Sequence, residues 1–402
     1  MMKKTLSAKA ARVQPSATLT IDAKFKQMKD DGMDVVGFGA GEPDFDTPDF
    51  IKEAAVQALK DGHTKYTPAS GLLKLRTAIC EKLEKDNKIT YKPSQIVVSN
   101  GAKHALYNAL VVLCNPGDEV ILSAPYWVSY YELIQMADAT PVVLQTTQAA
   151  QFKISEKDLE AVITDKTKAI ILNSPSNPTG MIYTKEELEK IARICEKHNI
   201  YVISDEIYEK LIYDDEEHVS IASLGDKIKE LTIVINGVSK SYAMTGWRIG
   251  YTASNQEIAT AMANYQSHAA SNPNTIAQHA TLAALEGPQD EVERMRQAFS
   301  VRRDHMVEKL NAIDGVSCTK PNGAFYVMMN IEKLLGKELY GKTIVNADDF
   351  CTTFLEVAGV ALVPCTAFGA PTHVRWSYAT SRANIDEGLS RLEKFIHNQY
   401  SK

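Results

Sequence analysis

One lysine of this chain lies in a polar, glycine-containing segment that suits neither a hydrophobic core nor an ordinary surface loop. Lys240 stands between two serines in SKSYAMTGWRIGY (239–251), just after the apolar run TIVIN, and Arg248 follows on the same segment. A lysine amine is a nucleophile toward carbonyl groups when its surroundings keep it neutral. The segment therefore makes Lys240 a candidate for covalent catalysis.

A carboxylate ends another apolar segment. Asp205 follows the largely apolar run YVIS, and Tyr208 comes three residues later. A carboxylate at that depth needs a cationic partner to stay charged. Asp is also favoured at helix N-termini, so a helix cap stays open as the structural alternative for this segment taken alone.

Three further segments place small or polar residues directly after apolar runs. In SNGAKHAL, Gly101 and Ala102 lie where a strand would turn into a helix, and free backbone N–H groups at a helix start bind phosphate. Trp127 in APYWVSY could stack on a planar ring, although core packing is the simpler interpretation for a lone tryptophan. NSPSNPTG contains Asn177 and by itself is only a turn.

The apolar pattern predicts how these residues come together. Strands apolar on both faces favour a buried, largely parallel sheet covered by helices, and sites in such sheets form at the carboxyl ends of the strands. Strands are expected at 95–100, 119–125, 140–146, 168–175, 201–206 and 232–239. Helices are expected at 71–87, at 184–199 (where Thr184 and Glu187 have capping-box spacing), at about 256–285 and at 288–312.

The length of 402 residues and a change of pattern predict two domains. The alternating pattern covers residues 46–290, which we assign to a large domain. Later strand-like segments at 323–331, 360–364 and 373–379 alternate with helical patterns at 346–359 and 384–400. We expect 291–402, joined by residues 1–45, to form a smaller α+β domain.

Composition narrows the class of protein. A net charge of -6 with scattered basic residues argues against nucleic-acid or membrane-surface partners. The six cysteines are widely spaced without metal-type pairing, so reduced thiols and no bound metal are expected. The N-terminal segment lacks a signal-peptide core, and no apolar run approaches the ~20 residues that cross a bilayer, so we expect a cytoplasmic protein.

Together the candidate residues match one ring cofactor. A lysine for an aldehyde, a carboxylate for a ring nitrogen and a backbone cradle for a phosphate fit pyridoxal 5'-phosphate. Nearly the whole chain resembles the class I aminotransferases of fold type I, and within them the bacterial aspartate aminotransferase subgroup. The resemblance rests on GFGAGEPDFDTP (37–48), TKYTPASG (64–71), NGAKHAL (100–106), NPGDEVILSAPYWVSY (115–130), NSPSNPTG (173–180), SDEIYE (204–209), SKSYAMTGWRIGY (239–251) and VRWSYATS (374–381).

The resemblance implies a fold and a reaction. The expected fold is that of the fold type I PLP-dependent transferases: an α/β large domain with a mostly parallel seven-stranded sheet between helices, and a smaller α+β domain. The implied reaction is a ping-pong transfer of the amino group of aspartate, or a related dicarboxylic amino acid, to 2-oxoglutarate. Broader or aromatic/prephenate specificity, helped by Arg12, stays an alternative, as does another PLP reaction such as that of a C–S lyase.

The resemblance also implies a role for each residue of the cofactor site. Lys240 would hold the cofactor as a Schiff base, and Asp205 would pair with the ring nitrogen. Tyr208 and Asn177 would bind the ring hydroxyl oxygen, while Trp127 would stack on the ring. The phosphate would be bound by the backbone of Gly101, Ala102 and Lys103, by Ser239 and Arg248, and by Tyr66 of the opposite subunit in a homodimer with shared sites.

On the substrate side, the resemblance implies that the planar fork of Arg375 binds the α-carboxylate in bidentate fashion. Gly39 would lie on the loop that covers the substrate, and Trp127 and Asn177 would also bind the substrate. Lys103 would bind the distal carboxylate of a dicarboxylic substrate. Cis peptide bonds are expected at Asn177–Pro178 and Ala124–Pro125, where relatives bend tightly.

Two other classes of protein fit the sequence less well. A non-catalytic protein that merely keeps this fold would usually carry an added DNA-binding domain, but only about 45 residues precede the large domain. A nicotinamide-dependent dehydrogenase would need GxGxxG leading into a helix, whereas GFGAGE (37–42) continues into Pro43. An intact Lys240 also disfavours the non-catalytic alternative.

Overall fold

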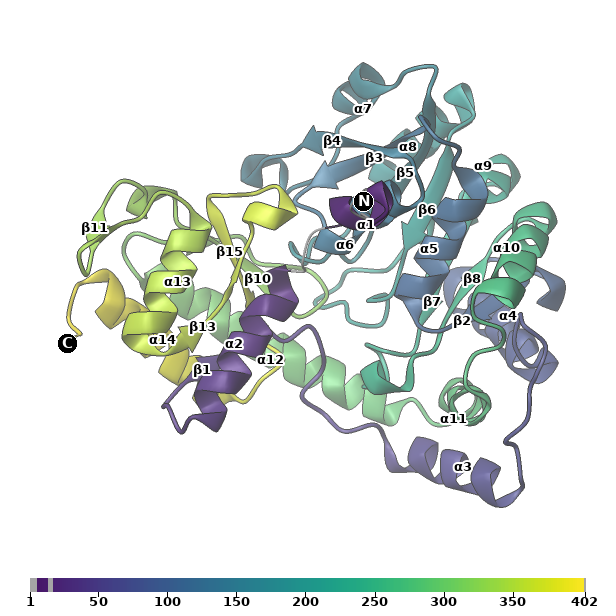
Figure 1. Ribbon diagram of the computed structural model, residues 1–402, viewed down its shortest axis with the longest axis horizontal. Helices are drawn as coiled ribbons and strands as arrows, with labels where there is room; N and C mark the ends of the chain where they lie inside the picture. The colour runs from purple at the N-terminus through teal and green to yellow at the C-terminus, as the bar shows by residue number, and fades with distance from the viewer. Residues whose placement is uncertain (1–5, 14–16, 401–402) are drawn as a thin grey trace, which may run out of the picture.

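The computed structural model describes residues 6–13 and 17–400, and its central element is a seven-stranded sheet (Figure 1). Every pair of neighbouring strands is parallel except where β8 lies antiparallel between β2 and β7. The strand order is β2-β8-β7-β6-β5-β3-β4, with β2 Ile96–Ser99, β3 Glu119–Ala124, β4 Thr140–Gln145, β5 Thr167–Asn173, β6 Tyr201–Asp205, β7 Thr232–Gly237 and β8 Gly250–Ala253. The six predicted strands and the mostly parallel sheet are confirmed.

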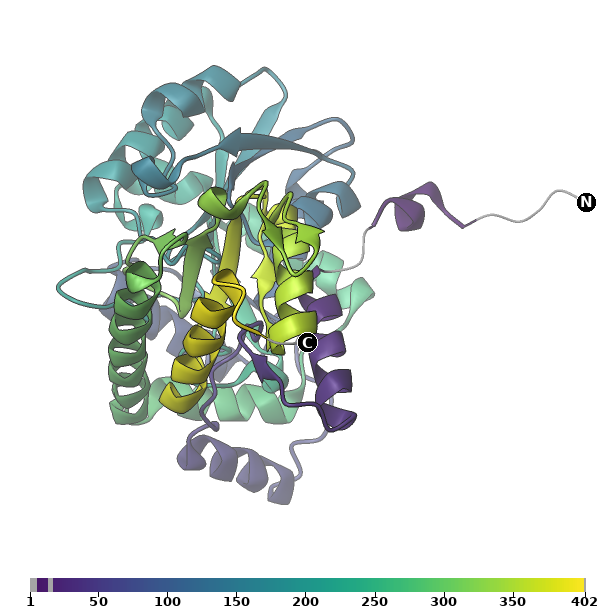
Figure 2. The same cartoon turned by 90° about the vertical axis from the view of Figure 1, so that its left-hand side faces the viewer.

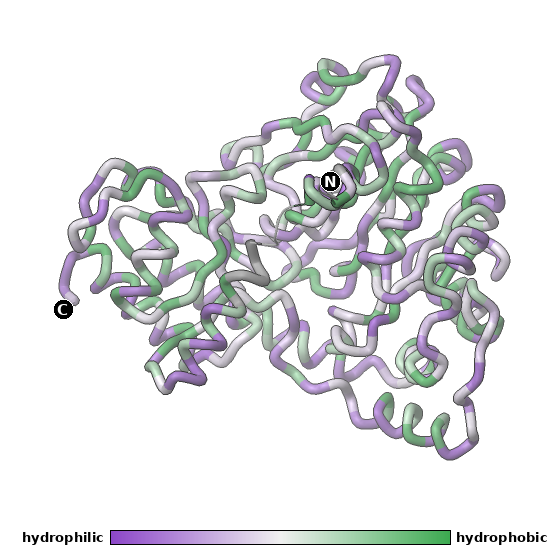
Figure 3. The backbone as a smooth tube through the Cα atoms, in the orientation of Figure 1, coloured by the Kyte–Doolittle hydropathy of each residue, from purple (hydrophilic) through white to green (hydrophobic). Residues whose placement is uncertain are grey.

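Alternation of apolar side chains along the strands places a hydrophobic core on each face of the sheet. In β7, Ile233 and Ile235 pack on the face covered by α5, α6 and α10, while Val234 packs on the face covered by α3, α4 and α11. Figure 3 shows the outer helices alternating between hydrophilic and hydrophobic residues, as expected for helices with one buried side. The helices of this part are α3 Asp49–Lys60, α4 Leu73–Asn87, α5 Ala102–Leu113, α6 Val128–Met136, α7 Glu156–Val162, α8 Lys185–His198, α9 Asp226–Leu231, α10 Gln256–Ala269 and α11 Thr275–Glu286.

Local capping signals decide where several of these helices begin. The capping box of Thr184 and Glu187 at the start of α8 is present as predicted. The helical pattern over 256–285 is two helices, α10 and α11, and not one. Pro273 lacks a backbone N–H, and the Asn274 side chain accepts from the N–H of Ala277 to begin a new helix.

The second part is built on a four-stranded antiparallel sheet with the order β14-β15-β10-β9. Its strands are β9 Ser317–Cys318, β10 Tyr326–Asn330, β14 Val363–Pro364 and β15 His373–Ser377, with a hairpin of β11 Glu338–Leu339 and β12 Lys342–Thr343. Figure 2 looks onto this part and shows α12 (Asp290–Ala312), α14 (Arg382–Ile396), α13 (Ala347–Ala358) and α2 (Ala17–Asp30) as a row.

Most of the described part of the N-terminal segment packs against this second part. β1 (Val36–Gly37) pairs in parallel with β13 (Val360–Ala361), and the ring of Phe38 lies 4.7 Å from that of Trp376. The short helix α1 (Ala8–Arg12) differs, because Lys9 Nζ pairs with Asp138 at 2.6 Å on the seven-stranded part. The division into 46–290 against 1–45 with 291–402 stays a prediction. Among the described residues no helix is long and apolar enough to cross a membrane.

A close backbone approach between β8 and the start of α5 yields the first prediction. A Cβ atom on Gly250 would lie 2.3 Å from the backbone nitrogen of Ala102, so Gly250→Ala must push the turn before α5 aside. We expect it to lower the free energy of unfolding by about 1–3 kcal/mol, as overpacked cores do. Gly246→Ala in the same segment is the control, because nothing lies within 4 Å of its added Cβ. Equal midpoints of urea unfolding for the two variants would contradict this.

Candidate active site

A cavity of about 370 Å³ lies where the carboxyl ends of the large sheet meet the second part. It is bounded by the segment after β1, by β10 and β15, and by the loops after β5, β6 and β7. All the predicted site residues line it except Gly101 and Tyr66. Gly101 lies against the guanidinium of Arg248. The lining residues are Gly39, Ala40, Gly41, Glu42, Ala102, Lys103, Trp127, Ser129, Tyr130, Asn173, Asn177, Asp205, Ile207, Tyr208, Ser239, Lys240, Thr245, Arg248, Tyr326 and Arg375.

Lys240 extends into this cavity from the segment after β7. Its Nζ donates to the backbone carbonyl of Gly41 at 2.5 Å and lies 5.9 Å from the centre of the Tyr208 ring. Burial lowers the pKa of Lys240 to about 8, with Arg375 and Arg248 acting in the same direction and Glu42 opposing them. The neutral amine is therefore well populated just above neutral pH, which a lysine nucleophile requires.

Asp205 lies at the carboxyl end of β6 and is only 5% exposed. Its Oδ2 accepts from the hydroxyl of Tyr130 at 2.7 Å, and its Oδ1 accepts from the N–H of Ile207 at 3.2 Å. Burial raises the pKa of Asp205 to about 6, and the Tyr130 hydrogen bond offsets part of that rise. No helix follows Asp205, so the helix-cap alternative is wrong. A cationic group in the cavity would stabilise the charged carboxylate.

Arg375, on β15, is a buried cation with an oriented but unneutralised guanidinium. It is 2% exposed; Nη1 donates to Asn177 Oδ1 and Nη2 to the carbonyl of Gly39, each at 2.9 Å. Its guanidinium carbon lies 4.4 Å from the ring centre of Tyr326 and 5.5 Å from that of Phe368. Its Nε has no hydrogen-bond partner, and no described carboxylate lies within ion-pair distance of it. Such a group favours binding of an anion from solution.

The start of α5 forms a second anion-binding feature. Gly101 precedes the helix with a φ of +86°, and a Cβ there would lie 2.4 Å from Nη2 of Arg248. Arg248 is held by its own bond from Nη1 to the carbonyl of Thr245 at 2.9 Å. Its guanidinium therefore lies against the helix N-terminus, where backbone N–H groups and the helix dipole favour a phosphate.

Lys103 and Trp127 form the neighbouring wall. Nζ of Lys103 lies 4.7 Å from the ring centre of Trp127, a cation–π distance. Burial and the charge of Arg248 lower the pKa of Lys103. Its ammonium has no carboxylate partner among the described residues, so it too can receive an anion.

Several residues of the site were missed by sequence reasoning. Tyr130 follows Trp127 by one helical turn, a spacing that could have indicated a shared face. Tyr326 contacts the hydroxyl of Tyr208 at 2.9 Å, but its segment was interpreted only as a strand. Asn173 donates to the backbone carbonyl of Asp205 at 3.0 Å and accepts from the N–H of Asn177 at 2.8 Å.

The backbone of the adjoining loops agrees with the prediction. The Ala124–Pro125 and Asn177–Pro178 peptide bonds are cis as expected, and Ser174–Pro175 is cis as well. Tyr66 lies outside the cavity of its own chain and is 91% exposed. Its predicted contact with the phosphate of a second subunit stays a prediction.

Comparison with known proteins agrees with this geometry. The family model for class I and II aminotransferases matches residues 33–392. The chain is 49% identical over 395 residues to a protein of Bacillus sp. (strain YM-2) named aspartate aminotransferase, covering 98% of this chain and 100% of the relative. It is 48% identical to a probable aspartate/prephenate aminotransferase of Aquifex aeolicus, covering 98% and 99%. The structure of Thermus thermophilus aspartate aminotransferase with maleate superposes with a TM-score of 0.93 at 41% identity, covering 98% and 100%.

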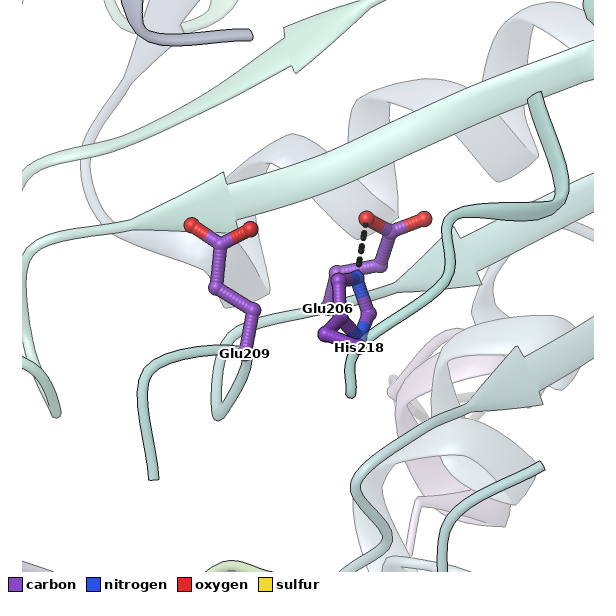
Figure 4. Close-up of side chains that lie close together, drawn as sticks. All are labelled: Glu206, Glu209 and His218. Carbon is purple, nitrogen blue, oxygen red and sulfur yellow. Dashed lines mark hydrogen bonds and ion pairs between the residues drawn. The ribbon is translucent and has the colours of Figure 1, made fainter. Parts of the chain in front are cut away.

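Behind the cavity, a second cluster of ionisable side chains follows β6. Glu206, Glu209 and His218 place potential metal-ligand atoms within 4.8 Å of one another (Figure 4). These atoms are already engaged: Glu206 accepts from Ser204, Ser220 and His218, and Glu209 accepts from Lys82 and Asn87. We interpret the cluster as a buried charge network that holds the loop after Asp205, with Lys82 supplying the cation.

This network predicts that loss of Lys82 lowers the free energy of unfolding more than loss of Lys210 does. Burial alone would raise the pKa of Glu209, but Lys82 and His218 together lower it to about 2. Lys82→Met leaves a buried, unpaired carboxylate and should lower the free energy of unfolding by about 3–5 kcal/mol at pH 7. Lys210→Met is the matched control: it breaks the more exposed pair with Asp86 and should cost less than about 1 kcal/mol.

The pH dependence of the same experiment checks its cause. A carboxylate whose folded-state pKa is lowered contributes stability above its unfolded pKa, and that stability is lost as the pH falls toward the folded value. The gap between the original protein and Lys82→Met, measured by urea unfolding, should therefore narrow from pH 5 toward pH 2. A gap that stays constant would mean that the loss comes from packing and not from charge.

Proposed function

The chain belongs to the class I and II aminotransferases, which use pyridoxal 5'-phosphate, and we propose that it moves the amino group of aspartate to 2-oxoglutarate. The observation that carries the aspartate specificity is the presence on one cavity of Lys103 and Arg375, neither of which has a carboxylate partner within the described part of the chain. A dicarboxylic amino acid supplies one anion for each cation. The relative from Bacillus is named for aspartate, and the Thermus enzyme is described with maleate, itself a dicarboxylate.

The cavity fits the cofactor on its own chemistry. Asp205 is a buried carboxylate without a hydrogen-bonded cation, as the protonated ring nitrogen requires. The start of α5 with Arg248 and Ser239 suits the phosphate, and Trp127 offers a ring face. Bound there, pyridoxal phosphate supplies an electron sink for the negative charge that develops at the substrate Cα. Tyr208 and Asn177 would bind the ring oxygen, and Nζ of Lys240 would carry the covalent bond to the aldehyde carbon.

The protein side chains then have distinct tasks in the reaction. Arg375 binds the substrate α-carboxylate and, through Asn177 and Gly39, is held in one orientation while doing so. With an amino acid in its place on the cofactor, Nζ of Lys240 would take the substrate Cα proton and return it to the cofactor carbon that had held the lysine. Burial favours the neutral amine that this step needs. Hydrolysis would then release the first substrate as a 2-oxo acid, and a second 2-oxo acid would receive the amino group by the reverse steps, which makes the scheme ping-pong.

A second specificity, toward prephenate, is favoured by the name of the Aquifex relative. Arg12, which sequence reasoning suggested for that substrate, lies on α1 with its guanidinium 3.7 Å from Asp138 and does not line the cavity of its own chain. Prephenate also carries two carboxylates, so Lys103 and Arg375 would serve it as well. The family match and the aminotransferase names favour transamination over the C–S lyase alternative.

Substitution of Lys240 tests the reaction class. Lys240→Ala should remove the absorbance of the lysine-bound cofactor and reduce turnover by at least about a thousand-fold, because nucleophile and base are lost together. Lys103→Ala is the control and should keep that absorbance. Both variants should retain the circular dichroism of the folded protein. Transamination by Lys240→Ala at a rate near that of the original protein would refute the assignment.

Substitution of Lys103 tests the specificity. A charge-assisted hydrogen bond is worth about 1.5–3 kcal/mol, so Lys103→Ala should lower kcat/KM for aspartate by about ten- to a hundred-fold. Alanine as amino donor should be little affected, because it has no distal carboxylate. The assay needs saturating cofactor, since the backbone of Lys103 also lies at the phosphate site. Equal losses for aspartate and alanine would show that specificity comes from elsewhere.

We further propose a homodimer in which Tyr66 contacts the cofactor phosphate of the partner subunit, and subunit mixing tests it. Tyr66→Phe should weaken cofactor binding by about two- to tenfold through loss of one hydrogen bond. In hybrids of Tyr66→Phe with Lys240→Ala chains, the site that keeps Lys240 receives an intact tyrosine from its partner. That site should therefore bind cofactor with the original affinity. The weakened affinity of Tyr66→Phe persisting in the hybrid would place Tyr66 at its own site.

A further inference from the structure

Among the described residues, Glu42 is the one carboxylate besides Asp205 that lines the cavity, and the reaction scheme gives it no task. Glu42 lies on the segment that leads from β1 in the second part across the cavity to α3. Its Oε2 accepts from the hydroxyl of Thr245 at 2.8 Å, and the carbonyl of the preceding residue, Gly41, accepts from Nζ of Lys240 at 2.5 Å. Two consecutive residues thus contact both ends of the segment that carries Lys240.

The charged side chains that face Lys240 have opposing effects on the protonation of its amine. Arg375 on β15 and Arg248 after the turn at 245–247 disfavour a protonated amine, while Asp205 on β6 and Glu42 favour it. Of the two carboxylates, Asp205 is committed to Tyr130 and, in the proposed function, to the ring nitrogen. Glu42 has the larger influence on the pKa of Lys240, and it is the carboxylate left to balance the arginines.

We propose that Glu42 is a positioning residue for Lys240: anchored by the Thr245 hydroxyl on the wall of the shared cavity, it holds in place the segment whose Gly41 carbonyl accepts from the Lys240 amine, and it adds a negative charge to that wall. The carbonyl of Gly41 accepts a hydrogen bond from that amine, so the same segment orients the group whose charge it controls. The inference depends on Lys240 being the reactive lysine of the proposed function. It does not depend on which amino acid is the substrate.

The test measures Lys240 directly in the protein freed of cofactor. Trace acetylation with acetic anhydride at a series of pH values, followed by peptide mass spectrometry, gives the pH midpoint of Lys240 reactivity. Glu42→Gln removes the charge at nearly constant shape and should lower that midpoint by about half a unit to one unit, as loss of a nearby opposite charge does. Because Glu42 is exposed, we expect the variant to fold normally.

A control variant and a salt series separate charge from structure. Asp44→Asn makes the same charge change on the same segment, but Asp44 pairs with Arg302 at 2.7 Å and does not line the cavity, so the midpoint should stay unchanged. The difference caused by Glu42→Gln should shrink between about 0.05 M and 1 M salt. An unchanged or raised midpoint in Glu42→Gln, or an equal shift in Asp44→Asn, would overturn the proposal. Failure of Lys240→Ala to impair transamination would instead overturn the proposed function.

Discussion

The active site depends on holding charged groups at the edge of a hydrophobic sheet without neutralising them. Arg375 is buried with its guanidinium oriented by Asn177 and Gly39, yet no described carboxylate pairs with it. Asp205 is buried with only a tyrosine hydroxyl and a backbone N–H on its oxygens. Charges kept this way carry a desolvation cost, and a ligand of complementary charge relieves it. The cavity is therefore preorganised for two ligands, a zwitterionic amino acid and a cofactor that bears a phosphate.

The fold places these groups close together by converging parallel strands. Asp205, Asn173 and the segment leading to Lys240 all follow carboxyl ends of neighbouring strands, β6, β5 and β7. The second part completes the site with Arg375 and Tyr326 from its own sheet. Glu206 and Glu209, with Lys82, anchor the loop that follows Asp205. These residues do not line the cavity, so the position of the Asp205 carboxylate depends on contacts outside the ligand site.

The same arrangement explains why the amine of Lys240 can be either neutral or protonated near neutral pH. Burial and two arginines lower the pKa of Lys240, and Glu42 acts against them, so the value of about 8 is a balance of opposing influences. Lys103, by contrast, has its pKa lowered by burial and by Arg248. Lys240 is half-buried whereas Lys103 is exposed, so burial favours the neutral amine more at Lys240, which is compatible with reaction at Lys240 and anion binding at Lys103.

Local pattern in the sequence was enough to predict the strands of the large sheet except β8, and to single out Lys240, Asp205 and Arg375 through motifs with a family resemblance. These features depend on periodicity and on residues close together in the chain. β8 was missed because its four residues begin at Gly250, inside the polar SKSYAMTGWRIGY motif (239–251). The partners that tune the site needed the tertiary structure: Tyr130 beneath Asp205, Tyr326 against Tyr208, and Gly41 on Lys240 from 199 positions away. Such contacts join distant segments, and only packing of the two parts decides which side chains meet.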